Sequence, residues 1–298
     1  MKVLLFGKNG QVGWELQRSL APLGEIIALD ADSPHLCGDF TNLDGIAATV
    51  QTVLPDVIVN AAAHTAVDKA ESEHEIVRTI NALAPGVLAK EAKAINALLV
   101  HYSTDYVFDG SGNKPWVETD ITAPLNAYGT TKLEGEKLIQ QSGCKSFIFR
   151  TSWVYGARGG NFAKTMLRLA AERESLSVIN DQMGAPTGAD LLADVTAHAI
   201  RAGIQQPKLF GMYHLVAAGE TSWYGYASFV LNIARQRGIS LKTAANAIKA
   251  VPSSEFQTAA KRPQNSRLNC AKLQSAFDLK LPNWQDGVER MLMEILEK

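Results

Sequence analysis

Short apolar runs alternate with stretches of helical pattern along the first half of the chain. Helical segments separate consecutive runs, and this order predicts βαβ units that build one doubly wound parallel sheet of the α/β class. The runs lack regular polar alternation, as is typical of strands covered on both faces, and they fall at residues 3–6, 26–29, 57–59, 98–102 and 147–149. Pro85 lies in a long helical stretch over residues 72–97, where it is predicted to end one helix and begin another.

The pattern loosens after about residue 155. The loops there are rich in Pro, Gly, Asn and Gln, and helices are predicted near residues 163–172, 191–202, 222–237 and 284–298. We therefore expect the sheet domain at residues 1–155. Residues 156–298 are expected to form mainly a smaller C-terminal α/β substrate-binding lobe, with segments able to cross between the two lobes.

Composition and charge narrow the class of protein. The 298 residues carry 29 basic and 30 acidic side chains, a net charge of −1, without the basic face that nucleic-acid and membrane-surface proteins usually need. The first apolar run is too short for a signal peptide, and no later stretch is long enough to span a bilayer. Cys37, Cys144 and Cys270 are far apart and form no Cys-x-x-Cys pair, which favours reduced thiols in a cytoplasmic protein. The six histidines do not fall at zinc-ligand spacing.

A glycine-rich segment follows the first strand and opens a helix. Gly7, Gly10 and Gly13 allow a tight turn and a close approach to a pyrophosphate, while Gln11 and Val12 begin the helix whose amide groups face the phosphates. A glycine-rich loop can be only a turn, but its place between a strand and a helix favours a dinucleotide site. Residues 1–155 are therefore expected to be a Rossmann-type dinucleotide-binding domain.

The choice of dinucleotide is left open by two conflicting residues. Asp30 ends the second strand, where an acid can accept hydrogen bonds from the adenosine ribose and repel a 2′-phosphate, which favours NADH. Lys8, within the glycine loop, can instead attract a 2′-phosphate and so allow NADPH. We expect use of both cofactors.

Other residues are expected to line the same cofactor. Asp39 and Phe40 are predicted to flank the adenine, although a role for Asp39 near a helix N-terminus is equally open because Thr41 and Asn42 follow. The small residues after the third strand let the cofactor lie against the backbone, and we expect contacts from Ala62, Ala63 and Thr65.

Three side chains suggest the chemistry of a ketone reduction. Tyr128 and Lys132 are four residues apart, so on a helix they share one face, and a neighbouring cation lowers the pKa of a phenol. Thr104 ends the fourth strand, and the carboxyl ends of parallel strands face the ligand crevice. We expect Thr104 to bind a carbonyl oxygen, Tyr128 to protonate it, and Lys132 to hold the nicotinamide ribose and lower the pKa of Tyr128. A strand-end hydroxyl bonded to its own backbone is the alternative for Thr104.

Taken together, these segments resemble the extended short-chain dehydrogenase/reductase superfamily, and within it the dTDP-4-dehydrorhamnose reductases. The resemblance spans nearly the whole chain. It is carried by Gly7-Lys8-Asn9-Gly10-Gln11-Val12-Gly13, Asn60-Ala61-Ala62-Ala63-His64-Thr65-Ala66-Val67-Asp68-Lys69-Ala70-Glu71, Ser103-Thr104-Asp105-Tyr106-Val107-Phe108-Asp109-Gly110, Tyr128-Gly129-Thr130-Thr131-Lys132, Arg150-Thr151-Ser152-Trp153-Val154-Tyr155-Gly156 and Arg262-Pro263-Gln264-Asn265-Ser266-Arg267-Leu268.

The resemblance implies NAD(P)H-dependent reduction of the 4-keto group of dTDP-6-deoxy-L-lyxo-4-hexulose to dTDP-L-rhamnose, which would feed a bacterial surface polysaccharide such as the O-antigen of lipopolysaccharide. Thr104 and Asp105 would then contact the sugar, and Trp153 would line it or else be a core tryptophan. Arg262 and Arg267 would bind the diphosphate, with surface salt bridges as the alternative.

Members of this family also form magnesium-bridged homodimers through carboxylates. By resemblance, Glu15, Asp190 and Glu294 are the acids that would hold Mg²⁺ here. Acids on helix surfaces are usually only solvated, and that interpretation is favoured.

Two other functions remain open at this point. Dehydratases of the same fold carry a glutamate where this chain has Tyr106, so an elimination is disfavoured, whereas a nucleotide-sugar epimerase that recycles its NAD is excluded less firmly. A cofactor-binding regulatory subunit, such as the one that partners methionine adenosyltransferase, is the alternative outside the enzymes.

Overall fold

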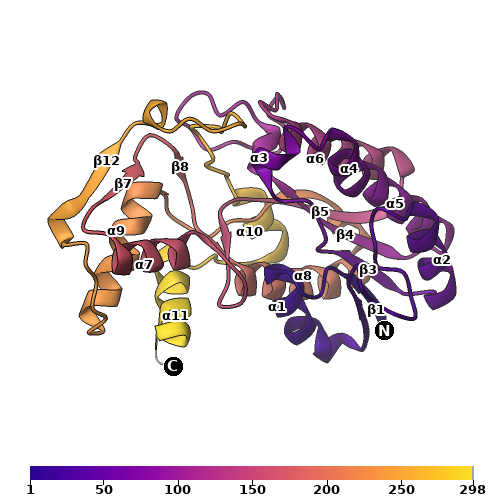
Figure 1. Cartoon of the computed structure of the whole chain (residues 1–298). Coiled ribbons are helices and arrows are strands. Elements are labelled where there is room, and N and C mark those ends of the chain that lie inside the picture. The colour runs from indigo at the N-terminus through magenta and orange to yellow at the C-terminus, as the bar shows by residue number, and fades with distance from the viewer. Residues whose placement is uncertain (297–298) are drawn as a thin grey trace.

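A computed structural model describes residues 1–296, and its largest feature is a six-stranded parallel sheet (Figure 1). The strands lie side by side in the order β10-β5-β4-β3-β1-β2. Five of them are the predicted apolar runs, namely β1 (Lys2–Phe6), β2 (Glu25–Leu29), β3 (Val57–Asn60), β4 (Leu98–Thr104) and β5 (Lys145–Thr151). The predicted doubly wound α/β sheet is therefore confirmed.

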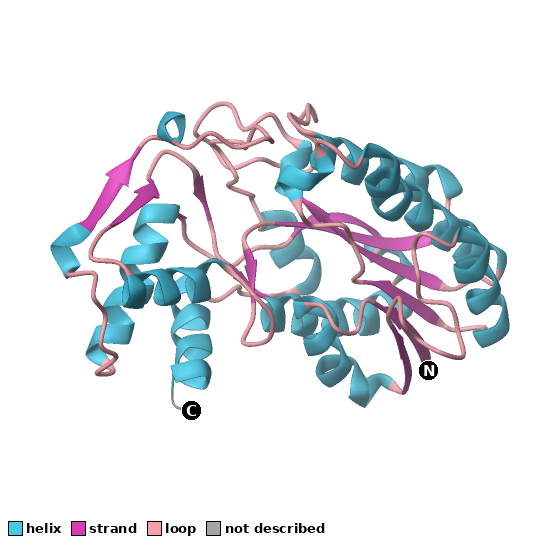
Figure 2. Cartoon of the chain, viewed as in Figure 1, coloured by secondary structure: helices cyan, strands magenta, loops and turns pink. Residues whose placement is uncertain are grey.

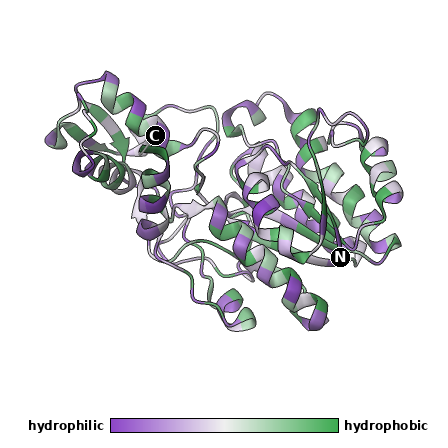
Figure 3. Ribbon diagram, turned by 90° about the horizontal axis from the view of Figure 1, so that it is seen from below, coloured by the Kyte–Doolittle hydropathy of each residue, from purple (hydrophilic) through white to green (hydrophobic). Residues whose placement is uncertain are grey.

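Helices cover both faces of this sheet, and each face has its own core (Figure 2). On one face Leu4 and Ile58 of the strands pack against apolar residues of α2 (Leu43–Val53), α5 (Ala84–Ala94) and α6 (Ala127–Ser142). On the other face Val3 and Val100 pack against α1 (Gln11–Leu20), α8 (Ala189–Gln205) and α10 (Ala271–Phe277). Figure 3 shows the green strands between these helices.

The sixth strand, β10 (Gly211–His214), comes from the second half of the chain and pairs in parallel with β5. Helix α8 also returns from that half and packs on α1. The chain therefore crosses between the lobes, and residue 155 marks only its first departure from the sheet domain. The four residues of β10 include two polar or glycine positions, too few apolar residues to be recognised as a strand.

The helical stretch before β4 is divided as predicted. It consists of α4 (His74–Arg78), a π-helical turn η2 (Thr79–Leu83) and α5, with Pro85 in the first turn of α5. Proline is tolerated there because the first amide groups of a helix have no carbonyl partner within it. The π turn keeps the three pieces continuous, so Pro85 begins a helix without a loop before it.

The smaller lobe is built on α7 (Phe162–Glu172), α9 (Trp223–Gln236) and α11 (Trp284–Leu296), beside a pair of parallel strands, β7 (Leu176–Ile179) and β12 (Ile248–Val251) (Figure 1). Its apolar cores are separate from those of the sheet. The remaining elements are short: α3 (Val67–Ala70), β6 (Val154–Tyr155), β8 (Met183–Gly184), β9 (Thr187–Gly188), β11 (Thr221–Ser222), η1 (Ala21–Leu23), η3 (Asp105–Val107), η4 (Pro207–Leu209), η5 (Ala245–Ala247) and η6 (Ser253–Glu255). Among residues 1–296, no helix has the length and apolar character needed to cross a bilayer.

Candidate active site

Helix α6 begins beside the loop that follows β4. Its N-cap residue is Asn126, whose Oδ1 accepts the Gly129 amide at 2.8 Å. Gly129 packs so closely on this loop that a Cβ there would lie 2.2 Å from the Tyr106 carbonyl oxygen. The cap and the glycine together bring the first turn of α6, which carries Tyr128, against the end of β4.

Thr104 and Tyr128 meet at this junction, as the sequence predicts. A side-chain hydrogen bond joins them, and Thr104 Oγ1 also donates to Asp105 Oδ1 and accepts the Tyr106 amide, both at 3.1 Å. The Tyr106 ring packs edge-on against Tyr128, with centroids 5.7 Å apart. Thr104 is thus positioned by its own backbone, and its single hydroxyl hydrogen, which points at Asp105 Oδ1, can turn to an oxygen beside the phenol.

Lys132 is buried on the same face of α6, but its effect on Tyr128 differs from the prediction. Its Nζ donates to the Tyr102 carbonyl oxygen at 2.5 Å and lies 3.2 Å from His101 Nε2. Burial lowers the pKa of Lys132 to about 8, against an opposing effect of Glu136. Burial raises the pKa of Tyr128 to about 12, with a smaller opposing effect of Thr104. The expected lowering of the Tyr128 pKa by Lys132 is therefore not found, because desolvation dominates both groups.

Asp105 is the other ionisable group at the junction. It is buried, its Oδ1 accepts Thr104, its side chain also bonds Ser266, and its Oδ2 has no partner in the described structure. Burial raises the pKa of Asp105 to about 7, because a buried carboxylate loses its hydration. At neutral pH the carboxyl can therefore hold a proton beside the site of Thr104 and Tyr128.

This burial predicts a pH-dependent stability. The pKa of Asp105 lies above its value of about 4 in an unfolded chain, so the folded state binds the proton more tightly. The stability that this proton contributes to the folded state is therefore fully present below about pH 4 and is lost as the pH rises through 7. We expect Asp105→Asn to gain up to about 4 kcal/mol over the native protein between about pH 4 and pH 8, measured by urea unfolding. Asp109→Asn, at a half-buried acid whose pKa is lowered, should show no such gain. An equal difference at both pH values for Asp105→Asn would contradict the account.

The glycine loop has the shape of a phosphate cradle. Gly7 has φ +84°, and a Cβ there would lie 2.7 Å from the Ala62 amide nitrogen; a Cβ on Gly13 would lie 2.0 Å from the Gly7 carbonyl oxygen. Gly10 caps α1 without a side chain, so the first amides of the helix, beginning at Gln11 and Val12, have no side-chain cap. The backbone is thus open to an anion at a helix N-terminus, and the loop fits a dinucleotide.

Of the other residues predicted to bind the cofactor, Asp30 has a carboxylate oxygen free for it, whereas Asp39 and Phe40 are engaged in local contacts. Asp30 follows β2 and its Oδ1 accepts the Ala31 amide, which leaves its Oδ2 for a ribose hydroxyl. Asp39 instead accepts the amide and hydroxyl of Thr41, and this supports the alternative of a local cap before α2. Phe40 is buried edge-on against Phe6 in the core.

Ala62, Ala63 and Thr65 lie in the loop after β3, beside the glycine loop. The Ala62 amide donates to Asn60 Oδ1 at 3.0 Å, which fixes the loop against the end of the strand. Ala62 and Ala63 are half-buried and Thr65 is exposed. All three residues thus lie in the loop next to the glycine loop, and their contact with the cofactor stays a prediction.

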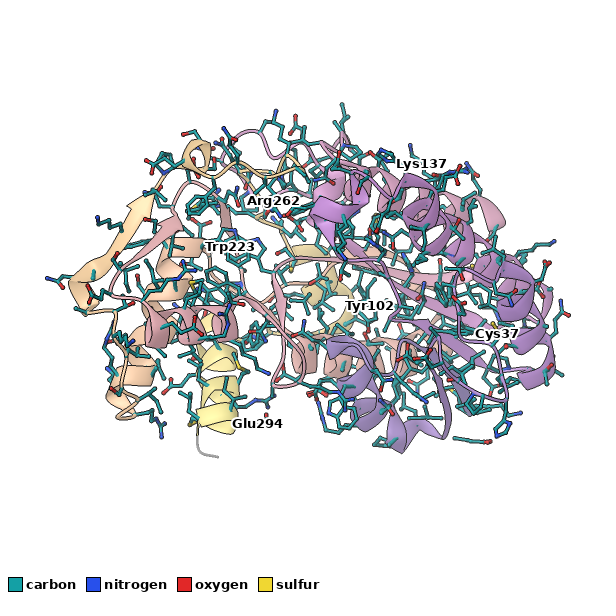
Figure 4. The ribbon with its side chains drawn as sticks, in the orientation of Figure 1. Cys37, Tyr102, Lys137, Trp223, Arg262 and Glu294 are labelled. Carbon is teal, nitrogen blue, oxygen red and sulfur yellow. The ribbon has the colours of Figure 1, made fainter. Side chains whose placement is uncertain are left out.

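A cavity of about 1400 Å³ lies between the lobes next to this junction. It is lined from the sheet side by Leu125 and Arg262 and from the smaller lobe by Phe162, Gln182 and Trp223 (Figure 4). Trp153 does not line it directly but stacks on Trp223, with ring centroids 3.7 Å apart. Trp223 is therefore the aromatic wall that sequence reasoning missed, because a Trp at the start of a helix carries no local signal of a ligand.

The two arginines assigned to the diphosphate are engaged with carboxylates. Arg262 pairs with Asp68 at 2.6 Å and bonds the Tyr106 side chain, and it also lines the cavity. Arg267 pairs with Glu220 at 2.6 Å and does not line the cavity. Both arginines thus form the salt bridges that were the alternative, and of the two only Arg262 also lines the cavity.

The acids matched to magnesium do not form a metal site within the described chain. Glu15 pairs with Arg18, Asp190 pairs with Arg290, and Glu15, Glu294 and both arginines line one small hollow. No group of three or more His, Cys, Asp or Glu side chains that could hold a metal is found in residues 1–296. Within one chain, therefore, Glu15 and Asp190 are engaged by guanidinium groups and do not by themselves form a Mg²⁺ site.

Comparison with known proteins gives this geometry a context. The model of the RmlD substrate binding domain matches residues 1–297. A dTDP-4-dehydrorhamnose reductase of Escherichia coli K12 is 61% identical over 295 residues, covering 99% of this chain and 98% of its own. The chain belongs to the dTDP-4-dehydrorhamnose reductase family.

Solved structures agree with this assignment. A dTDP-4-dehydrorhamnose reductase of Clostridium acetobutylicum is 35% identical with a TM-score of 0.89 and full coverage of both chains. That of Bacillus anthracis, solved in complex with NADP, is 36% identical with a TM-score of 0.87, covering 98% of this chain and 99% of its own. The chain is thus an oxidoreductase of this family with an NAD(P)-binding fold.

Proposed function

We propose that the protein reduces the 4-keto group of dTDP-6-deoxy-L-lyxo-4-hexulose to dTDP-L-rhamnose. The observation that carries this proposal is the junction of β4 and α6, where Thr104 and Tyr128 are hydrogen-bonded beside Tyr106, whose partner Arg262 lines a large cavity. The family's named activity supplies the substrate. Rhamnose synthesis in the cytoplasm, for a surface polysaccharide such as O-antigen, and a homodimeric state are part of the same proposal.

The reduction needs a proton donor at the carbonyl oxygen, and Tyr128 is suited to this role. With a pKa of about 12 the phenol is protonated at neutral pH, and the Thr104 hydroxyl beside it can donate to the same oxygen when its hydrogen turns from Asp105. When NADPH or NADH is bound at the glycine loop, it supplies the hydride for the carbonyl carbon. Lys132, with a pKa of about 8, can return a proton to the phenolate, since the proton passes to the stronger base.

The cavity supports the choice of a large substrate. Its lining combines apolar side chains at Phe162 and Trp223 with polar ones at Gln182 and Arg262, which suits a sugar nucleotide with an aromatic base and a diphosphate. We assign the substrate-binding role to Asp105, Trp153 and Arg262. Trp153 acts through its stack on Trp223, which holds the wall of the cavity in place.

The proposal is tested by turnover. Purified protein is incubated with the dTDP-ketosugar and NADH or NADPH, with and without EDTA, and the product is identified by NMR. We expect dTDP-L-rhamnose in every arm. Interconversion of sugars without cofactor consumption would indicate an epimerase, and a stable heteromeric partner in a pull-down, without turnover, would indicate a regulatory subunit.

Cofactor choice is predicted to depend on Asp30. Removing its carboxylate deletes a charge-assisted hydrogen bond to the NADH ribose and a charge that repels a 2′-phosphate, so Asp30→Ala should raise the NADPH-to-NADH ratio of kcat/KM by about tenfold or more. The matched control is Asp32→Ala, at an exposed acid two residues away, which should leave the ratio near its native value. An unchanged ratio in Asp30→Ala would remove this residue from the ribose site.

A further inference from the structure

A chain of buried polar groups connects the cofactor loop to Lys132. Asn60, at the end of β3, is the register partner of His101 on β4, and both side chains are almost completely buried. Asn60 Nδ2 lies 3.0 Å from His101 Nδ1, and His101 Nε2 lies 3.2 Å from Lys132 Nζ. The mechanism described above makes no use of Asn60 or His101.

The direction of these hydrogen bonds follows from the donors at one end. The Ala62 amide can only donate, and it donates to Asn60 Oδ1 at 3.0 Å, so the Asn60 NH₂ group must face His101. His101 Nδ1 therefore accepts. A neutral imidazole that accepts at Nδ1 carries its proton on Nε2, and this proton points at Lys132.

The Nε2–H group of His101 affects which protonation state of Lys132 is favoured. An ammonium group has only donors, so a protonated Lys132 would face the Nε2–H of His101 donor to donor, whereas a neutral amine can accept it. The other ionisable groups around Lys132 are Glu136, which is bound to Arg150 of β5, and Tyr128 one turn earlier on α6. Asp105 of η3 acts on Tyr128. Among α3, α4, η2 and α5, the buried charged side chain is Glu91 of α5, which accepts a hydrogen bond from Gln51 of α2.

We propose that Asn60 and His101 are positioning residues that weaken the hold of Lys132 on its proton: Asn60 fixes the Nε2–H tautomer of His101, and this tautomer disfavours the ammonium, so that Lys132 gives its proton more readily to the phenolate of Tyr128. The lowered pKa values of Lys132 and His101 agree with this arrangement. The proposal links the loop that carries Ala62 to the proton supply of Tyr128. Its consequence for turnover rests on the proposed function, but the tautomer itself does not.

The tautomer is measured directly by long-range ¹H–¹⁵N NMR of the ¹⁵N-histidine-labelled protein, with His101→Gln used to assign the signal. We expect His101 to be neutral with its proton on Nε2. Asn60→Asp replaces the donor by an acceptor of the same shape, so it should move the proton to Nδ1 and turn Nε2 into an acceptor for the Lys132 ammonium. Asn81→Asp, which places the same change against the backbone of His64, should leave the His101 tautomer unaltered.

The pH profile gives a second readout that a purely structural role would not move. The alkaline limb of kcat/KM reports loss of the proton from the Tyr128–Lys132 pair. In Asn60→Asp this limb should shift upward by about one pH unit, since the carboxylate and the new acceptor stabilise the ammonium. Native His101 protonated on Nδ1 or on both nitrogens, or an Asn60→Asp variant with an unchanged tautomer, would overturn the proposal. If the His101 tautomers are as expected but the protein shows no turnover, the result would count against the proposed function alone.

Discussion

Tyr128→Phe is expected to lower turnover by roughly 100-fold or more while cofactor binding is nearly unchanged. The substitution removes only the hydroxyl that bonds Thr104, and with it the proton donor for the carbonyl oxygen. The ring, which packs against Tyr106, stays in place, so the site should keep its shape. Steady-state kcat and the dissociation constant of NADPH, measured by fluorescence titration, check the two parts of this expectation.

A matched control separates the chemical role of a hydroxyl from its structural role. Tyr213 lies on β10, away from the junction of β4 and α6, and its hydroxyl donates a hydrogen bond to the Leu209 carbonyl oxygen at 2.6 Å. Tyr213→Phe removes this hydroxyl. This variant should lose stability by about 1 kcal/mol but keep its turnover. Near-native turnover in Tyr128→Phe would contradict the assignment of Tyr128 as the proton donor.

Arg150→Met is expected to lower the free energy of unfolding by about 3–5 kcal/mol. Arg150 on β5 binds Glu136 on α6 through two hydrogen bonds of 2.9 and 2.6 Å, and the two side chains are 4% and 0% exposed. Without the guanidinium, the Glu136 carboxylate would remain buried without its partner. Because Glu136 lies one turn after Lys132 on α6, the same loss should loosen the helix that positions Tyr128.

The double variant Arg150→Met with Glu136→Leu provides the control, since it removes both charges. It should recover most of the lost stability, because a buried ion pair replaced by apolar side chains of similar volume is often nearly neutral. Urea unfolding of the native, single and double variants gives the comparison. A single variant within about 1 kcal/mol of the native protein would show that the pair does not hold α6 on the sheet.

Local patterns predicted the sheet because the strands of a doubly wound fold are buried on both faces and so appear as apolar runs. The same reasoning missed β10, whose Gly211 and His214 break the apolar pattern, and which pairs with β5 from the second half of the chain. Strand pairing between distant segments depends on tertiary contacts. For the same reason the sequence allowed segments to cross between the lobes but did not identify them as α8 and β10, which return to the sheet domain.

The meeting of Thr104 with Tyr128, and the place of Lys132 on the same face of α6, could be predicted because helical spacing and strand ends fix where side chains point. The electrostatics were not, because they depend on burial: Lys132 bonds the Tyr102 carbonyl, and desolvation raises the Tyr128 pKa. Trp223 reaches the cavity only through the packing of the smaller lobe. Position along one element is encoded locally, whereas solvent exclusion and contacts between lobes are properties of the whole fold.

The central claim is tested most directly by following the hydride. The protein is supplied with the dTDP-ketosugar and NADPH or NADH deuterated at the transferable position of the nicotinamide, and the product is examined by NMR. The account predicts one cofactor oxidised for each ketosugar consumed, with deuterium at C4 of dTDP-L-rhamnose. Conversion of the sugar with no cofactor consumed and no deuterium at C4 would contradict it.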